Sequence, residues 1–464
     1  MSISEEATRM LLAPMFDNFV DRKPYCVMAR ASLERMLAAT RLDELFRKHA
    51  TVQYERELLF SQLIEVMARV VTRVDRSVLR AVEALRDVLP VTDEAIYQKL
   101  RGVETPVSQA LVRDSFREAA AVLDKLKVAD QSWVRGLRVK ILDGNHLAAT
   151  QHRIKELRTI WDAPLPGRAL VVWDQITRLV SDVFLTECGH ASERTLLDEV
   201  LETVEKDDLW IADRNFCTLG FLFGLWSRGA RFVIRQHGQL VGKPVGQPRL
   251  VGKTVHGEKV YEQSVVLTHE GREQTVRRIT IKLRTPTRDG DTELHILSNL
   301  TRREASAVRI GELYQKRWII EAVFHELTMA LQCEVNTLGY PKAALFAFCV
   351  ALLLENALSM LKGSLRAAHG EEATAELSGN LLSYELQTTY EGMMVAIPAE
   401  NWMQFGTMPL IKFVNFLKSM AKRVDITRYR KHKRGPKKPP TPHEKYHNGG
   451  HASTAKFLAL RHSE

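Results

Sequence analysis

The sequence predicts a mixed α/β fold, in which one sheet carries helices on its faces and helical regions precede and follow it. Three observations predict this class. Near Leu137 the apolar residues change from helical spacing to strand-like runs. Strands and helices then alternate as far as His237, which is typical of a sheet covered by helices. Beyond that point a segment rich in Gly and Pro leads into two further strands, so we expect a β-rich insert at about 237–290.

The region before the predicted sheet, residues 1–130, has the apolar spacing of helices and is strongly mixed in charge. Within it, residues 91–114 are typical of two helices joined by a short turn, with Thr92 or Asp93 as the first cap and Gly102 at the break. This spacing fits a helix-turn-helix DNA-binding motif, and it fits an ordinary helical hairpin equally well. The sequence therefore predicts a helical domain here, with both forms of the hairpin left open.

The sheet region is predicted to span residues 137–345. Its expected order is a strand at 137–144, two strands within 169–188, a helix at 193–206, a strand at 209–214, a helix at 218–229 and a strand at 231–238. In the insert, alternating residues at 258–269 and 273–284 predict two strands paired across a turn. A long helix then closes the region.

Helices are predicted again for residues 346–424, and a basic tail follows at 425–464. The tail is rich in His and Pro and poor in apolar residues, which indicates disorder. Residues 422–445 hold ten Lys or Arg against two acidic residues, so this segment alone carries +8 of the formal net charge of +10. Any nucleic-acid surface on the rest of the chain must therefore be a local patch.

Composition excludes several classes of protein. No run reaches the ~18 uninterrupted apolar residues that a membrane span needs, so no membrane partner is expected. The nearest run, Ala343–Leu354, ends at Glu355 and is predicted to be a buried helix. The first residues have neither the basic start nor the apolar run of a signal peptide. The five cysteines show no Cys-x-x-Cys spacing, which favours a reducing cytoplasm over a zinc or disulfide framework.

Carboxylates from three separate predicted elements form the candidate site. Asp143 and Asp213 each end a predicted strand, and Glu321 lies on the long helix. Either aspartate alone is more often a turn-former. Together, three such carboxylates can hold two divalent metal ions. An uncompensated cluster would repel itself, whereas a pair of Mg²⁺ ions would remove that penalty, so a metal site is favoured over an ion-pair network.

Polar residues accompany Glu321 along its helix. At about 100° per residue, four of them fall within an arc of about 60°, beside an apolar stripe that is expected to face the core: Tyr314, Arg317, Glu321 and Thr328. Glu312 falls off this arc and is interpreted as a solvated helix residue. The arc is therefore an ordered polar edge beside buried structure.

The segments that carry these residues resemble the DDE transposases of the bacterial insertion-sequence-four family. DGN at 143–145, ADRNF at 212–216 and YQKRWIIEAVFH at 314–325 resemble the family's motifs, the last of which reads Tyr-x2-Arg-x3-Glu-x6-Lys. The resemblance runs from about Leu137 to Leu331. It implies a ribonuclease-H-like core with a β-strand insert between the second Asp and the Glu.

The sequence departs from the family pattern at two places. Thr328 stands where the family has its final Lys, and no lysine follows until Lys342. A threonine hydroxyl can reach a DNA phosphate but brings no charge to it. The insert contains no tryptophan, the residue that some relatives use there to hold a flipped base. Trp318 is the remaining candidate stacking residue, and a helix-core position is its equally supported alternative.

By this resemblance the protein is a cut-and-paste transposase that cleaves and joins the ends of its own element. Three catalytic residues would bind two Mg²⁺ ions, with Mn²⁺ able to substitute: Asp143, Asp213 and Glu321. Four residues would contact the DNA: Tyr314, Arg317, Trp318 and Arg214. The resemblance further implies DNA-end binding by the 1–130 domain, a hairpin intermediate and a homodimer in the synaptic complex.

Two alternatives stay open from the residues. A related nuclease or resolvase with the same core would cut double-stranded DNA without joining it. A catalytically silent DNA-binding repressor of transposition would keep the fold without the chemistry, although such a repressor has no use for the three carboxylates.

Overall fold

The computed structural model describes residues 14–53, 56–147, 167–188, 191–240, 242–287, 290–335, 338 and 340–431. Up to Arg430 the described residues form one compact unit. The first thirteen residues and the tail beyond Lys431 lie outside the described residues, so the prediction of a disordered tail rests on the sequence.

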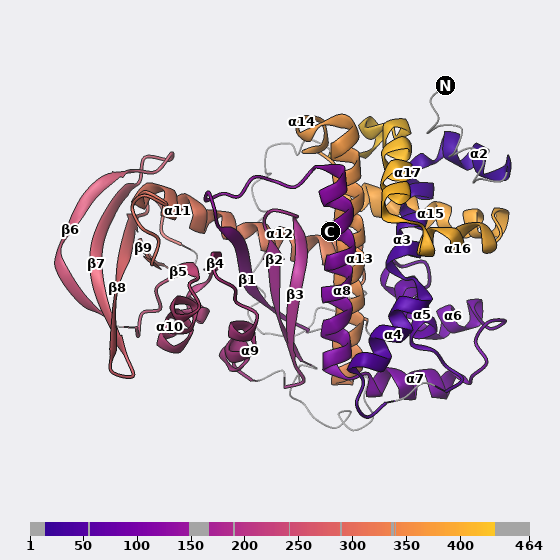
Figure 1. Cartoon of the computed structure of the whole chain (residues 1–464), viewed down its shortest axis with the longest axis horizontal. Coiled ribbons are helices and arrows are strands. Elements are labelled where there is room, and N and C mark those ends of the chain that lie inside the picture. The colour runs from indigo at the N-terminus through magenta and orange to yellow at the C-terminus, as the bar shows by residue number, and fades with distance from the viewer. Residues whose placement is uncertain are drawn as a thin grey trace, which may run out of the picture. The chain divides into compact units, whose positions relative to one another are not determined.

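The described strands form one nine-stranded mixed sheet, in the order β3-β2-β1-β4-β5-β9-β8-β7-β6. Their bounds are β1 (Arg138–His146), β2 (Arg168–Asp174), β3 (Leu179–Thr186), β4 (Asp208–Ala212), β5 (Arg231–Arg235), β6 (Lys243–Lys253), β7 (Lys259–His269), β8 (Arg272–Lys282) and β9 (Glu293–Ser298). Strands β1, β4 and β5 are parallel to one another, and the other neighbours are antiparallel. Figure 1 shows the insert strands β6 to β9 continuing the sheet on the side away from β3. The predicted mixed α/β class is confirmed.

Strands β6 and β9 were not expected from the sequence. β6 is an edge strand that pairs with β7, and its residues are almost all exposed, so it has no buried face to produce an alternating pattern. Its Pro244 and Pro248 are tolerated because an edge strand has a free side. β9 lies between β5 and β8 and buries three consecutive residues, which again hides the period of two.

The helices form two groups, one before and one after the sheet in sequence, and α13 of the second group lies at the centre of both. The first group is α2 (Pro14–Arg22), α3 (Pro24–Met36), α4 (Ala39–His49), α5 (Phe60–Val71), α6 (Val78–Ala84), α7 (Asp93–Gly102) and α8 (Thr105–Leu126). The second is α13 (Pro341–His369), α14 (Glu371–Thr374), α15 (Gly379–Ala396), α16 (Glu400–Thr407) and α17 (Leu410–Arg423). Helix α13 packs against α3, α5, α8 and α17 (Figure 1).

The helical regions predicted at 1–130 and 346–424 do not separate from the sheet region. One apolar core runs through helices of both groups and continues under one face of the sheet. A second, smaller core on the opposite face is covered by α9 (Leu197–Glu202) and α10 (Leu219–Ser227). Sequence patterns report which residues are buried, not which element covers them, so the shared core was not predictable from them.

The predicted hairpin at 91–114 forms as α7 and α8, and the Thr92 hydroxyl accepts a hydrogen bond from the amide of Ala95, as expected of a cap. Helix α8 packs on α13 and β3, and residues along its whole length are buried. A recognition helix needs an exposed face to enter a DNA groove. The packing of α8 therefore favours an ordinary helical hairpin.

Helix α13 is long and apolar enough to cross a membrane, and 94% of its most apolar window is buried inside the protein. The prediction of a buried helix at Ala343–Leu354 is confirmed, although the helix continues to His369. Its Glu355 is 3% exposed. The carboxylate accepts a hydrogen bond from Ser359 Oγ at 3.3 Å, and its second oxygen has no hydrogen-bond partner among the described residues. Burial, together with the nearby Glu326 carboxylate, raises the pKa of Glu355 to about 8.

Replacing Glu355 by Gln is expected to flatten the pH dependence of stability. The pKa of Glu355 rises from 4.5 to about 8 on folding, so its stabilising contribution is complete below about pH 4.5 and is lost as the pH rises towards 8. We expect a wild-type loss of a few kcal/mol across this window, most of it absent from Glu355→Gln. Urea unfolding from about pH 5 to about pH 9 measures this loss of the free energy of unfolding. Glu372→Gln is the control, because Glu372 is exposed. Parallel profiles for wild type and Glu355→Gln would contradict this account.

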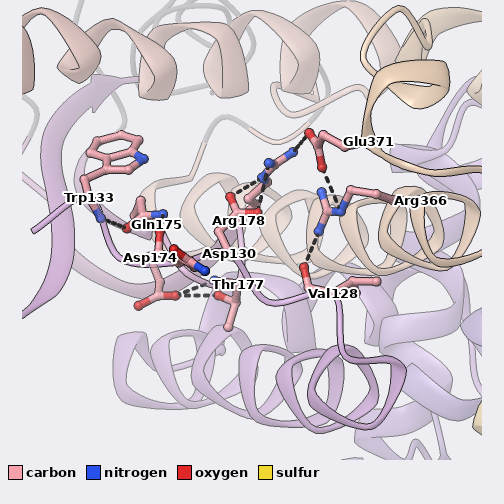
Figure 2. A network of polar contacts seen from close by, with 10 residues as sticks. Val128, Asp130, Trp133, Asp174, Gln175, Thr177, Arg178, Arg366 and Glu371 are labelled. Atoms are coloured by element: carbon pink, nitrogen blue, oxygen red, sulfur yellow. Dashed lines mark hydrogen bonds and ion pairs between the residues drawn. The ribbon is translucent and has the colours of Figure 1, made fainter. Parts of the chain in front are cut away.

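An ion-pair network ties the β2–β3 hairpin to the helices (Figure 2). Arg178, in the turn between β2 and β3, has a left-handed φ of 60°. Its guanidinium donates to Asp130 at 2.6 and 3.0 Å and to Glu371 at 2.9 Å. Arg366 of α13 lies 3.4 Å from Glu371 and donates to the carbonyl of Val128 at 2.9 Å. The network fixes the hairpin turn, the end of α8 and the start of α14 together.

The folded region extends past the boundary predicted at residue 425. Ile426–Tyr429 form a 3₁₀ turn, Arg430 bridges to Leu377, and Ile426 and Tyr429 are buried. These two apolar residues lie within the basic segment, where the surrounding charges hid their role as a C-terminal anchor.

Candidate active site

The two aspartates lie side by side on adjacent parallel strands. Asp213 directly follows β4, as expected, whereas β1 continues past Asp143 to His146 in pairing with β2, so the prediction that Asp143 ends its strand is wrong. Leu142 of β1 pairs with Ala212 of β4, and Asp143 and Asp213 each follow directly. Side chains of paired neighbours point to the same face of a sheet, so the two carboxylates face the same side. The apolar residues Ile141 and Ile211, two positions earlier on the same face, anchor both strands in the larger core.

The third carboxylate lies on a helical segment that crosses this face. The segment comprises α11 (Ala307–Gln315), a 3₁₀ turn at Lys316–Trp318 and α12 (Ile319–Ala330), so the single helix predicted here contains a tighter turn. Leu313, Ile320 and Leu327 are buried beneath it. These anchors turn the polar edge of the segment towards the two aspartates.

The polar edge contacts all three carboxylates. Tyr314 Oη donates a hydrogen bond to Asp213 Oδ1 at 3.0 Å. Arg317 Nη1 donates to Asp143 Oδ2 at 2.6 Å, and its Nη2 donates to Glu321 Oε1 at 3.2 Å. Arg317 therefore bridges a carboxylate of the sheet and a carboxylate of the helix, and the structure brings together five of the residues that the sequence singled out.

Burial and mutual repulsion perturb these groups. Burial raises the pKa of Asp143 to about 6, against the opposing effects of Arg317 and of the Gly144 amide, while the charges of Asp213 and Glu321 raise it further. Burial and the neighbouring Asp213 carboxylate raise the pKa of Tyr314, which stays a neutral donor. Burial lowers the pKa of Arg317, but the adjacent carboxylates raise it by more, so its pKa lies above the ordinary value. The cluster thus contains more negative charge than one guanidinium neutralises.

The donor set fits a hard divalent cation, because Mg²⁺ and Mn²⁺ prefer carboxylate oxygens. Among the described residues, however, no three His, Cys, Asp or Glu side chains lie close enough to hold one ion as they stand. The Arg317 guanidinium lies between Asp143 and Glu321. A cation that binds all three carboxylates must therefore displace Arg317 from at least one of them.

The other predicted contact residues lie outside this cluster. Trp318 is 59% exposed, and its ring lies 5.0 Å from the Arg317 guanidinium carbon, so it is not a core residue. Arg214 Nη1 lies 3.7 Å from Asp291 Oδ2. Thr328 is exposed, and its hydroxyl donates to the carbonyl of Phe324 at 3.0 Å.

Sequence reasoning missed the groups that support the aspartates. The Gly144 amide donates to Asp143 Oδ1 at 2.9 Å. Asn215, two residues after Asp213, donates to Glu193 Oε2 at 2.6 Å. The segment 193–206 was predicted as a single helix, whereas Glu193 opens a separate 3₁₀ turn, η2 (Glu193–Leu196), before α9. No spacing signal connects Glu193 to either aspartate, because the contact is formed only by the fold.

The match to one protein family agrees with the chemistry of this cluster. Residues 135–354 match the family model described as "Transposase DDE domain", a match that supports a DDE transposase and includes all three carboxylates. No curated protein matches the chain. One similar solved structure is the piggyBac transposase synaptic complex with hairpin DNA, with a TM-score of 0.41, 9% sequence identity, and coverage of 82% of this chain and 84% of that chain.

Proposed function

We propose that this protein is a transposase that cleaves and joins the ends of a DNA element, with Asp143, Asp213 and Glu321 as its catalytic carboxylates. The observation that carries the proposal is their convergence, from two adjacent strands and one helix, within the segment that matches the transposase domain family. Three carboxylates from separate elements are the apparatus of two-metal phosphodiester chemistry.

A ribonuclease-H-like core is part of this proposal. The sheet order β3-β2-β1-β4-β5 supports it, with an antiparallel β1-β2-β3 meander followed by parallel β4 and β5. Strands β6 to β8 lie between the second Asp and the Glu along the chain, as the resemblance to the insertion-sequence-four family implies.

Mg²⁺, or Mn²⁺ in its place, would supply water activation and stabilisation of the leaving oxygen when it is held by the three carboxylates. Arg317 would turn from the carboxylates to a phosphate, for which its planar guanidinium is suited. Tyr314, a neutral hydroxyl held on Asp213, would keep that carboxylate oriented and donate to the substrate backbone. A hairpin intermediate and a homodimeric synaptic complex are further parts of the proposal, by the same resemblance.

Arg73 offers a cation near the position where the family has lysine. Arg73 lies in the loop after α5, and its guanidinium donates a hydrogen bond to the backbone carbonyl of Thr328 at 3.0 Å. Arg73 is exposed, so it can also meet a phosphate that passes along this edge of α12. Within the proposed function, Arg73 replaces the charge that Thr328 lacks.

A cleavage-and-joining assay tests the function. Supplied with the inverted ends of its element, target DNA and Mg²⁺, the protein is expected to nick at the ends and insert them into the target. Cleavage without insertion would select a nuclease or resolvase. Specific binding with neither reaction, in Mg²⁺ or Mn²⁺, would select a repressor.

Trp318→Ala is expected to weaken binding of DNA ends with exposed or distorted bases by about 1–3 kcal/mol, because stacking on an aromatic ring contributes that much per base. Stability should hardly change, since the ring is 59% exposed. Trp318→Phe, which keeps an aromatic face, should retain most of the affinity. Fluorescence anisotropy with paired and frayed ends measures the difference, and equal losses on both substrates would show that the ring does not stack.

Deleting residues 432–464 is expected to weaken binding to specific and random DNA alike and to flatten its salt dependence. The segment contributes much of the net charge, and each phosphate contact adds about 0.9 to the slope of log affinity against log salt. The structured anchor at Ile426–Tyr429 stays in place in this truncation. An unchanged salt slope with loss of specific binding alone would show that the tail reads sequence.

A further inference from the structure

A buried carboxylate lies directly beside Gly144, the residue of β1 that follows Asp143. Glu193, the first residue of η2, is 8% exposed. A Cβ placed on Gly144 would lie 2.4 Å from Glu193 Oε1 and 2.9 Å from its Oε2, so the carboxylate rests on the glycine Cα. Gly144 does not have a positive φ. A side chain at this position would therefore have to displace the Glu193 carboxylate, while the backbone conformation places no restriction on it.

The same 3₁₀ turn also holds the chain after Asp213. Glu193 Oε2 accepts a hydrogen bond from Asn215 Nδ2 at 2.6 Å, and Arg194 Nε donates to the Asn215 carbonyl at 2.7 Å. Arg168 Nη1 at the start of β2 lies 3.9 Å from Glu193 Oε1. Glu193 thus contacts the residue after Asp143, and Glu193 and Arg194 both contact Asn215 in the turn after Asp213.

We propose that Glu193 is a positioning residue that sets the separation of the Asp143 and Asp213 carboxylates. It braces Gly144, whose amide holds Asp143 Oδ1, and through Asn215 it fixes the turn after Asp213. This inference rests on the proposed function and adds to it a residue outside the set proposed to hold the metal or contact the DNA.

Burying a carboxylate is unfavourable unless charged or polar donors satisfy it, so a purely structural contact would be met by an apolar side chain at lower cost. Here the donors come from two other elements, β2 and the turn after β4. The hydrogen bond from Asn215 has a defined length and direction, so it constrains the segment after Asp213 in a way that non-directional apolar packing does not. Groups that orient metal-binding carboxylates typically change metal affinity or activity by about 10- to 100-fold when they are removed.

The test is a double-mutant cycle between residues 144 and 193. Gly144→Ala is expected to lower both Mn²⁺ affinity and the DNA cleavage rate by about 10- to 100-fold, because its Cβ displaces the Glu193 carboxylate. Glu193→Ala should give a loss of similar size. The double variant Gly144→Ala/Glu193→Ala should be no worse than Glu193→Ala, since the methyl group then has room. Glu193→Gln, which keeps the acceptor for Asn215, should lose less than about tenfold.

Mn²⁺ affinity by electron paramagnetic resonance, DNA affinity and thermal unfolding are measured on each variant, with the exposed Glu199→Gln of α9 as the matched control. Reduced Mn²⁺ affinity with unchanged DNA affinity is the expected signature of positioning. Additive losses in the cycle, or wild-type Mn²⁺ affinity in Glu193→Ala, would overturn the inference. Absence of cleavage by the wild-type protein would count against the proposed function instead, because the cycle in Mn²⁺ affinity can still be read.

Discussion

Replacing Asp143, Asp213 or Glu321 by Ala is expected to abolish Mg²⁺-dependent cleavage, by about a thousandfold or more for each variant. The metal ions would stabilise the transition state by several kcal/mol, and about 4 kcal/mol corresponds to a factor of about 10³ in rate. Affinity for DNA ends should stay largely intact, because phosphate contacts elsewhere supply it. Single-turnover cleavage and equilibrium binding on the same labelled DNA ends separate the two effects.

The matched control is Glu312→Ala, which removes a carboxylate from the same helical segment without touching the cluster. Glu312 pairs with Arg309 at 3.0 Å, and this ion pair is lost in the variant. Its cleavage rate should remain within a few-fold of wild type. Substantial cleavage by a variant of any one of the three carboxylates would remove that residue from the catalytic set, whereas loss of DNA binding would indicate that it holds the fold.

Residue patterns predicted the strands whose apolar residues form a continuous run or alternate. β4 and β5 are buried as continuous apolar runs and β7 and β8 alternate, so all four were expected near their observed bounds, as was β1. β6 lacks a buried face, and β9 buries only its last three residues, so neither has such a pattern and neither was expected. The union of the N- and C-terminal helices around α13 depends on tertiary packing, for which the sequence contains no periodic signal.

The candidate site was predictable to the same extent. Asp143 and Asp213 were recognised from the apolar strands that precede them, although β1 continues past Asp143 to His146. Tyr314, Arg317 and Glu321 were recognised by their helical spacing. Helical spacing could not show that Arg317 would reach across to the sheet, because this contact joins residues 174 positions apart. Helical spacing also placed Thr328 on the same arc, but in the structure Thr328 lies beyond the cluster, at the exposed end of α12.

The bridge formed by Arg317 predicts that this residue and the metal ion compete for the same carboxylates, so that each stabilises the folded protein more when the other is absent. Its side chain is 7% exposed and pairs with Asp143, which is 18% exposed, and with the more accessible Glu321 at 43%. In metal-free solution, Arg317→Ala should lower the free energy of unfolding by about 3 kcal/mol, because it leaves a buried carboxylate without its cation. Arg317→Lys should lose less, since it keeps the charge but not the two-pronged geometry.

Mg²⁺ should then stabilise Arg317→Ala more than it stabilises the wild-type protein. In the wild type, Mg²⁺ must displace a guanidinium from the carboxylates. In Arg317→Ala the carboxylates have no guanidinium to lose, so Mg²⁺ binds the folded variant more tightly than it binds the folded wild type. Urea unfolding with and without Mg²⁺ measures this difference. The control is Arg80→Ala, which removes the exposed ion pair with Glu83 at 2.9 Å, and it is expected to cost less than about 1 kcal/mol and to be indifferent to Mg²⁺. Equal stabilisation of Arg317→Ala and wild type would mean that the ion and the guanidinium do not share the carboxylates. Cleavage by Arg317→Ala should nevertheless fall, because the residue that leaves the carboxylates is the one expected to hold the scissile phosphate.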